Sequence, residues 1–187
     1  MGLFDKIKSA FVSSDGKMMA PEASFATRPD TVYAPVSGVL VSLKEVNDEV
    51  ISAGLLGDGY GILPTGSNVL YSPINGRIGA TTVTNHSIAI ATDDGMEVLI
   101  HIGIGTVNMK GRGFTRLVES NQEVRAGQPL MTFDVDAIKL AGYEEVIACV
   151  ISNPESFSAI EHVGETGTLL GGRPLVKIGD PLLVAKK

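Results

Sequence analysis

The sequence contains one cysteine, few basic residues and no long hydrophobic run. Cys149 cannot form an internal disulfide, which agrees with the reducing environment of the cytoplasm. No segment reaches the roughly 18 consecutive apolar residues of a membrane-spanning helix, and charged residues interrupt the first apolar positions, so we expect no secretory signal. The 15 Lys and Arg residues against 21 Asp and Glu residues give a net charge of −6, which argues against nucleic acid as a partner.

Tryptophan is absent as well, whereas glycine and proline are abundant. The 187 residues include 22 Gly and 9 Pro, which separate many short runs rich in valine and isoleucine. This spacing is typical of short strands joined by tight turns. With 44% hydrophobic and 19% charged residues, the chain has the composition of a globular protein. We therefore predict an all-β fold.

The N-terminal segment MGLFDKIKSAFVSS (1–14) differs from the rest of the chain. Its apolar residues recur at helical spacing, with Asp5, Lys6 and Lys8 between them. The pattern predicts a short amphipathic helix that could lie on an anionic membrane surface. Alternatively, the helix docks onto the domain or frays, because about 12 residues are marginal for a free helix. Residues 15–30 are typical of a linker, and we expect the folded domain at residues 31–187.

Two pairs of similar segments indicate a domain built from two related halves. VYAPVSGVLVSL (32–43) and VLYSPINGRIGA (69–80) share a Tyr-x-Pro-[Val/Ile]-x-Gly core, and EVRAGQPLMTFD (123–134) is similar to LVKIGDPLLVAK (175–186). Each segment has the pattern of a strand, a glycine-containing turn and a second strand. Since none of them could bury its apolar face alone, we predict an antiparallel β-sandwich or flattened barrel.

One histidine lies within the apolar run EVLIHIGIGTV (97–107), where we predict a buried strand. The preceding Asp94-Gly95 predicts a two-residue hairpin turn, which places His101 opposite Ile88 and His86 opposite Gly103. Side-chain alternation then directs both imidazoles to one face, with Gly103 leaving room for their tips to meet. A three-residue loop would reverse this parity and place the rings on opposite faces.

Two convergent histidines permit several chemistries. They could hold a metal ion, although two imidazoles leave zinc short of ligands, or they could form an acid–base pair. One neutral ring could also act as a nucleophile while the other stabilises the transferred group. An apolar environment favours the neutral ring, which has a lone pair free to attack phosphorus. The alternative without a function is a pair of core histidines with satisfied hydrogen bonds.

Six segments in register resemble the glucose-type enzyme IIA domain of the bacterial phosphoenolpyruvate-dependent sugar phosphotransferase system. They are YAPVSG (33–38), GDGYGILPT (57–65), SPINGRI (72–78), TNHSIAI (84–90), IHIGIGTVNMKGRGF (100–114) and VRAGQPLMTFD (124–134). The resemblance implies a two-lobed antiparallel β-sandwich, the duplicated hybrid motif, that acts as a phosphocarrier. The opening residues also resemble those of stand-alone members, whose amphipathic segment contacts the membrane. This resemblance implies a cytoplasmic protein that is partly peripheral at the inner face of the cell membrane.

The resemblance also implies site residues. His101 matches the histidine that accepts a phosphoryl group at Nε2 from the phosphohistidine of the small carrier HPr and passes it to a cysteine of the permease IIB domain. His86 matches the second histidine, which hydrogen-bonds the phosphoryl group, and Thr84 matches the hydroxyl residue that orients His86. Asp48 falls at an acidic position on the rim of the site. No cofactor is required, but in some members His86 and His101 contribute to a zinc site shared with a regulated partner.

Partners follow from the same resemblance. Besides HPr and the IIB domain of a glucose-type permease, some members regulate adenylate cyclase, glycerol kinase or permeases outside the phosphotransferase system. An apolar ring of Val50, Ile51, Leu55 and Leu56 could dock a partner and exclude water, or could simply pack in the core.

Three positions depart from the family pattern. Gly105 replaces the acid of the usual His-x-Gly-x-Asp motif, Leu63 stands where a charged residue is usual, and Ile147–Val150 replaces Thr-Pro-Val-Val. The missing acid flanks the site and favours a basic partner in the family. Its absence therefore bears on the partner, whereas the groups that transfer phosphate are retained.

Two other classes of protein share related β folds. A zinc peptidase of this kind needs a His-x-His pair, which the chain lacks, and the third histidine, His162, lies in a polar segment. A lipoyl or biotin carrier needs a lysine at a hairpin tip between hydrophobic residues, and Gly111 beside Lys110 fits this poorly. We interpret Lys110 as a surface lysine and Cys149 as a core residue.

Overall fold

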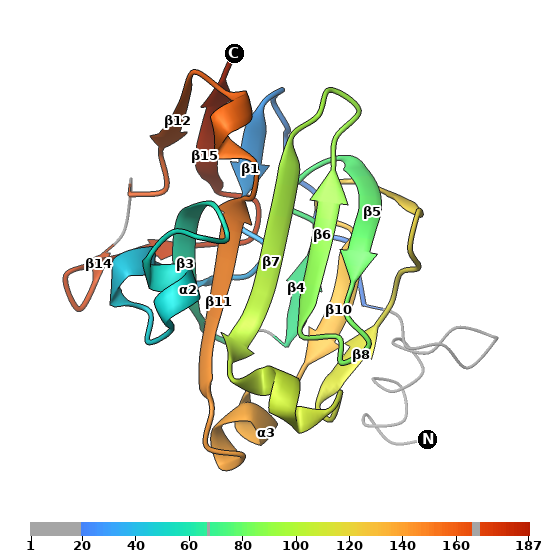
Figure 1. Ribbon diagram of the computed structural model, residues 1–187, viewed down its shortest axis with the longest axis vertical. Coiled ribbons are helices and arrows are strands. Elements are labelled where there is room, and N and C mark those ends of the chain that lie inside the picture. The colour runs from blue at the N-terminus through green and yellow to red at the C-terminus, as the bar shows by residue number, and fades with distance from the viewer. Residues whose placement is uncertain (1–19, 67, 166–168) are drawn as a thin grey trace.

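The computed structural model describes residues 20–66, 68–165 and 169–187, so the helix predicted at residues 1–14 lies outside the described residues. The centre of the structure is a nine-stranded sheet (Figure 1). Its strands, in spatial order, are β13 (Leu169–Leu170), β14 (Arg173–Val176), β2 (Gly38–Ser42), β3 (Asp58–Pro64), β11 (Glu144–Ile151), β7 (Glu97–Ile104), β6 (Ser87–Ala91), β5 (Gly76–Thr81) and β9 (Glu123–Val124).

Two three-stranded sheets lie behind the large sheet in the view of Figure 1. One contains β1 (Thr31–Tyr33), β15 (Pro181–Lys186) and β12 (Ala159–His162), and the other contains β4 (Val69–Tyr71), β10 (Pro129–Phe133) and β8 (Phe114–Arg116). Within the described residues the helical elements are short: η1 (Leu43–Glu45), α2 (Glu49–Ser52), η2 (Thr106–Met109), α3 (Val135–Leu140) and η3 (Pro154–Ser156). The layered antiparallel sheets confirm the predicted all-β sandwich.

The two predicted repeats occupy equivalent places in the structure. β1 pairs with β15 and β2 with β14, just as β4 pairs with β10 and β5 with β9. The repeats also bond to each other reciprocally: Tyr33 N–H donates to the Pro73 carbonyl over 3.0 Å, and Tyr71 N–H donates to the Pro35 carbonyl over 2.9 Å. This exchange of equivalent bonds confirms the prediction of two related halves.

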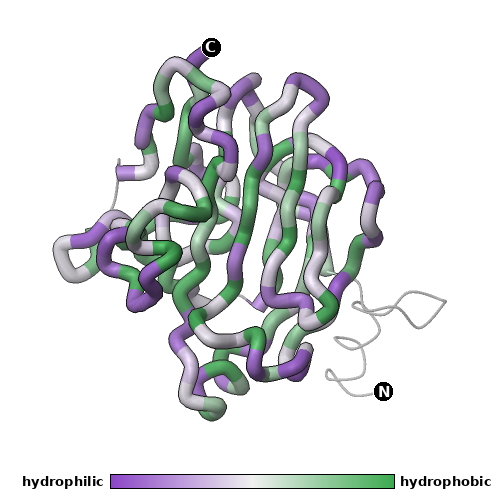
Figure 2. Tube along the Cα trace, viewed as in Figure 1, coloured by the Kyte–Doolittle hydropathy of each residue, from purple (hydrophilic) through white to green (hydrophobic). Residues whose placement is uncertain are grey.

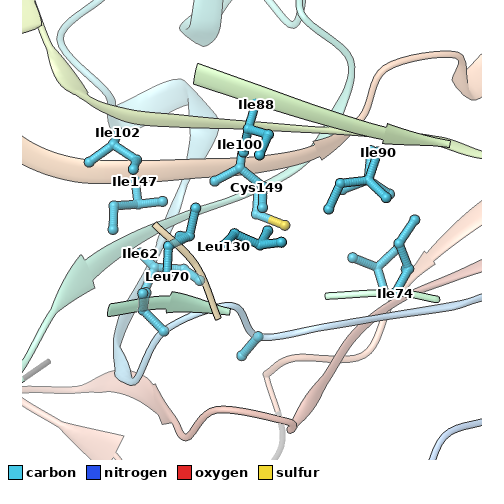
Figure 3. Packing of buried hydrophobic residues seen from close by; sticks show 14 of the residues in the cluster. Ile62, Leu70, Ile74, Ile88, Ile90, Ile100, Ile102, Leu130, Ile147 and Cys149 are labelled. Carbon is cyan, nitrogen blue, oxygen red and sulfur yellow. The ribbon is translucent and has the colours of Figure 1, made fainter. Parts of the chain in front are cut away.

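The main core lies between the large sheet and the two small ones. Figure 3 shows Ile88, Ile100 and Cys149 of the large sheet above Leu130 and Leu70 of the small sheet. All five side chains are buried. Burial raises the pKa of the Cys149 thiol to about 12, so this cysteine is an inert core residue, as predicted.

A second, smaller cluster covers part of the opposite face of the large sheet. It contains Val41, Leu43, Val46, Ile51, Val146, Ala148 and Val150, with Leu56, Leu99 and Ile104 packed against it. Because residues alternate along β11, Ile147 and Cys149 face the main core while Val146, Ala148 and Val150 face this second cluster. β11 is therefore hydrophobic on both faces, and Figure 2 shows hydrophobic residues along much of its length.

The hairpin between β6 and β7 has a different register from the predicted one. Ser87, rather than Ile88, lies opposite His101. The loop contains three residues, because Thr92 N–H donates to the Met96 carbonyl over 2.9 Å and Gly95 has a φ of 94°. An Asp-Gly pair also suits a three-residue loop that ends in left-handed glycine, so the two-residue prediction was wrong.

Residues 20–28 form neither helix nor strand and lie against the domain. The Phe25 ring packs 5.2 Å from the Tyr33 ring, Arg28 N–H donates to the Tyr33 hydroxyl over 2.6 Å, and Ala23 N–H donates to the Gly127 carbonyl over 2.9 Å. Within the described ranges, helices of the length and apolar character needed to cross a bilayer do not occur.

Candidate active site

His86 and His101 lie next to each other on the outer face of the large sheet. Their ring centroids are 5.1 Å apart, and the planes meet edge to face at 78°. His101 belongs to β7 and lies beside Ala148 of β11, within the face that carries the second cluster. Both imidazoles are partly exposed. The two rings therefore lie in contact on one face of the sheet, as the sequence predicts.

The rings meet for a different reason from the predicted one. His86 precedes β6 and comes directly after a turn. In this turn Asn85 has a φ of 55° and donates its N–H to the Thr82 carbonyl over 3.0 Å. Strand alternation does not fix the direction of a side chain in such a turn. The three-residue loop reverses the parity between the two strands, but the turn before β6 sets the direction of His86. The two rings therefore still lie together.

Gly103 also has a role that differs from the predicted one. Its φ is 71°, in the left-handed region that favours glycine. A Cβ at this position would collide with Thr106 Cγ2 and lie 2.9 Å from the Glu144 carbonyl oxygen. Glycine is thus required by the bend at the end of β7 and by its packing, rather than by the space that His86 needs.

Two hydroxyl groups face the Nδ1 atom of His86. Thr84 Oγ1 is 2.6 Å from this nitrogen, and Thr82 Oγ1 is 3.3 Å from it. Thr84 was singled out in the sequence, whereas Thr82 was missed. Thr82 lies two residues before Thr84 in the sequence, but the approach of its hydroxyl to His86 depends on the turn before β6.

Burial sets the protonation of both rings. It lowers the pKa of His101 below its ordinary value, and the neighbouring His86 lowers it further, against the opposing effects of Asp48 and the Gly103 carbonyl. Burial also lowers the pKa of His86. Both imidazoles are therefore neutral at neutral pH. His101 Nδ1 is buried, and no hydrogen bond of normal geometry reaches it from the described residues.

The helix α2 packs on the same face of the sheet as His101, and the charge of Asp48 acts on the pKa of His101. Asp48 caps this helix, accepting hydrogen bonds from the backbone N–H groups of Val50 and Ile51 over 2.9 Å each. Val50 and Leu55 are exposed by 45% and 74%. Ile51, by contrast, is only 2% exposed and belongs to the second cluster, and Leu56 packs against that cluster. Of the predicted apolar ring, Val50 and Leu55 are thus the surface members.

The segment after β7 carries a further exposed apolar side chain that sequence reasoning missed. Val107 of η2 is 49% exposed. Gly105, in place of the family's acid, caps η2 with a φ of 77°, and a Cβ there would lie 2.7 Å from the Tyr143 ring. The absence of a side chain at residue 105 therefore has a local packing reason in this chain.

The third histidine is elsewhere. His162 Nε2 lies 2.8 Å from Asp58 Oδ1, and its ring packs edge-on against Tyr60. Across the described part of the chain, no three His, Cys, Asp or Glu side chains form a group suited to a metal ion. His86 and His101 could supply two of the four ligands that zinc usually takes, and the others would have to come from another molecule.

Comparisons with known proteins agree with this geometry. The family described as "phosphoenolpyruvate-dependent sugar phosphotransferase system, EIIA 1" matches residues 30–157. A glucose-specific EIIA component of Haemophilus influenzae is 34% identical over 176 residues, covering 94% of this chain and 97% of that protein. The glucose permease IIA structure from Mycoplasma capricolum is 32% identical, with a TM-score of 0.68 over 87% of this chain and 99% of that one.

Some relatives are much longer. The beta-glucoside-specific EIIBCA component of Bacillus subtilis is 36% identical over 156 residues, which are 82% of this chain but 25% of that protein. The match to the family covers most of the chain, includes both histidines and is supported by a solved structure of the same fold. The chain therefore belongs to the EIIA 1 family of the phosphoenolpyruvate-dependent sugar phosphotransferase system.

Proposed function

We propose that His101 Nε2 carries a phosphoryl group from the phosphohistidine of HPr to a cysteine of the IIB domain of a glucose-type permease. The observation that carries this proposal is the contact between two neutral imidazoles, one of which is held by a threonine hydroxyl. The fusion of EIIA to EIIB in the Bacillus subtilis relative supports a IIB-type acceptor.

The reactive atom of His101 follows from the burial of its ring. Because Nδ1 is buried, it is out of reach of a donor, so we assign the attack to the lone pair of Nε2 and the proton of the neutral ring to Nδ1. The lone pair attacks phosphorus in line with the P–N bond of the donor, so that a new P–N bond forms as the old one breaks. In the second step a cysteine thiolate attacks, an S–P bond forms, and the electron pair of the broken N–P bond returns to Nε2.

His86 stabilises the charge of the group in transfer. When the Thr84 hydroxyl donates to Nδ1 of His86, the ring proton is on Nε2, which can donate a hydrogen bond to a phosphoryl oxygen. A neutral donor that is already oriented needs no reorganisation during the reaction. Thr84 is therefore a positioning residue that acts through His86.

A docked partner would exclude water during transfer. Val50 and Leu55 in and after α2, and Val107 in η2, are exposed apolar side chains that such a partner could cover. A partner that covers these side chains would displace water that could otherwise hydrolyse the phosphohistidine.

Labelling with phosphoenolpyruvate, enzyme I and HPr tests the proposal. We expect an acid-labile, base-stable adduct on the wild-type chain and no label on His101→Gln. His86→Gln should still accept the label but pass it to IIB roughly 100-fold more slowly, the typical loss for one oxyanion donor. His162→Gln is the matched control and should behave as the wild type does.

Other outcomes identify the alternatives. A peptidase or a lipoyl carrier would take up no label at all. Equal loss of labelling in His86→Gln and His101→Gln would instead indicate a metal site, with zinc completed by a partner. Membrane contact through residues 1–14 and the regulated partners remain predictions.

A further inference from the structure

A cavity of about 430 Å³ lies near the edge of the large sheet that carries β14, which is at the left of Figure 1. Among the described residues, β14 pairs with β2 only at Gly38 and Val39, and the cavity lies beside the next residues of β2, Leu40–Ser42. Its volume is within the roughly 300–1,000 Å³ of small-molecule sites. His101 is on β7, with β3 and β11 between it and β2, so the cavity is separate from the two active-site histidines.

One wall of the cavity is the side chain of Tyr60. This residue is only 4% exposed, yet its hydroxyl makes no hydrogen bond of normal geometry with the described residues. The ring is held edge-on against His162, whose Nε2 lies 2.8 Å from Asp58 Oδ1. Burial, with a smaller contribution from the Glu165 carboxylate, raises the pKa of Tyr60 to about 12, so the hydroxyl keeps its proton. A buried donor without a partner costs free energy, which a bound acceptor would recover.

The opposite charges in the lining neutralise each other. Arg173 donates two hydrogen bonds to Glu45, over 2.9 and 2.7 Å, and the Ser42 N–H donates to the same carboxylate over 3.0 Å. The guanidinium has further N–H groups that these contacts do not use. The pair therefore presents hydrogen-bond donors to the cavity without a net charge.

The remaining charge in the lining is the carboxylate of Glu165, which forms no ion pair with the described residues. Its negative charge disfavours anions, and because it is exposed, it attracts a cation only weakly. A neutral molecule with several hydroxyl groups, by contrast, offers acceptors to Tyr60 and Arg173 and donors to Glu165. Its C–H groups can pack on the apolar lining residues Leu40 and Pro174.

We propose that this cavity binds an uncharged polyhydroxy compound of monosaccharide size. The Tyr60 hydroxyl donates to one hydroxyl oxygen of the ligand. The binding is independent of the proposed phosphoryl transfer at His101.

NMR titration of the unphosphorylated chain tests the proposal. The probes are glucose, galactose and mannose, each compared with its 6-phosphate and its 2-amino derivative. We expect at least one uncharged sugar to give saturable shifts in the backbone amides around Tyr60 and His162, while the amide of His86 stays unchanged. The 6-phosphate should bind more weakly, because Glu165 repels it. The amino derivative should bind no more than about fivefold more tightly than the sugar, the limit for one exposed ion pair.

Tyr60→Phe is the most specific variant, because it removes only the unpaired hydroxyl. It should weaken sugar binding about tenfold, the value of one hydrogen bond, without lowering the urea midpoint of unfolding. Tyr71→Phe is the matched control, a buried tyrosine on β4 that does not line the cavity, and it should bind the sugar as the wild type does. His101→Gln should also bind the sugar as the wild type does.

Several results would contradict the proposal. The first is the absence of saturable shifts with all three uncharged sugars, or tighter binding of a 6-phosphate than of its parent sugar. The second is wild-type binding by Tyr60→Phe, or a loss of stability in this variant, which would show that the hydroxyl already has a partner in the folded chain. Loss of binding in His101→Gln would place the sugar at the active site instead of the cavity.

Discussion

At the scale of single residues, His86 and His101 illustrate how burial determines reactivity. Their pKa values are lowered mainly because burial disfavours the charged ring. In the proposed transfer, the same neutral state would leave a lone pair on His101 for attack and a single proton on His86 for donation. A Thr84 hydroxyl that donates to Nδ1 of His86 would place that proton on Nε2.

The lowered pKa values also make stability depend on pH. Between the folded pKa and the ordinary value of 6.5, the unfolded chain binds more protons than the folded chain, so the free energy of unfolding rises with pH. We expect full stability above about pH 6.5 and a loss as the pH falls below it.

Urea unfolding across this pH range measures the effect. His101→Gln should show a weaker loss on acidification than the wild type, because the buried titrating ring has been removed. A steeper loss in His101→Gln, or a wild type that gains stability as the pH falls through this range, would contradict the account.

Thr84 offers a second prediction at this scale. Thr84→Val removes the hydroxyl that holds His86 Nδ1, and transfer to IIB should slow about tenfold, the value of one hydrogen bond. Thr84→Ser should restore the rate. The ring ¹⁵N shifts of His86 should move in the valine variant and return in the serine variant, which a loss of stability alone would not produce.

At the scale of elements, the end of β7 and the turn before β6 place the two rings. The bend at Gly103 directs the chain into η2, and the turn through Asn85 directs His86 toward His101. Both bends depend on left-handed backbone conformations, which glycine and asparagine adopt most readily.

Substitution of Gly103 tests the importance of the first bend. Gly103→Ala introduces left-handed strain and a collision with Thr106, and we expect a loss of roughly 2–4 kcal/mol in the free energy of unfolding. Gly95→Ala is the control: its φ of 94° is also strained, but no atom lies within 4 Å of the added Cβ, so the loss should be roughly 1–2 kcal/mol. Equal losses in urea unfolding would show that packing at Gly103 contributes nothing.

The sequence predicts the elements better than their register. The two Tyr-x-Pro-x-x-Gly segments form strand–turn–strand units as predicted, because proline and glycine restrict the turn locally. The Asp94-Gly95 pair is compatible with both a two-residue and a three-residue hairpin loop, so the sequence alone does not determine the loop length. The direction of His86 depends on the φ of Asn85, which no spacing rule specifies.

At the scale of the whole molecule, the duplicated architecture brings the site to its centre. β11 and β7 occupy the middle of the nine-stranded sheet, with strands of the first repeat on one side and of the second on the other. His101 lies on one of these central strands, opposite Ala148 of the second cluster. The sequence does not reveal this cluster, because a strand buried on both faces lacks the alternation that would mark an outer face.

The most direct test of the phosphocarrier assignment is NMR spectroscopy of the ¹⁵N-histidine-labelled chain after phosphorylation by phospho-HPr. We predict a one-bond coupling between ³¹P and the Nε2 atom of His101, with the His86 ring shifted but uncoupled. Coupling to Nδ1 of His101, or to any nitrogen of His86 or His162, would contradict the assignment.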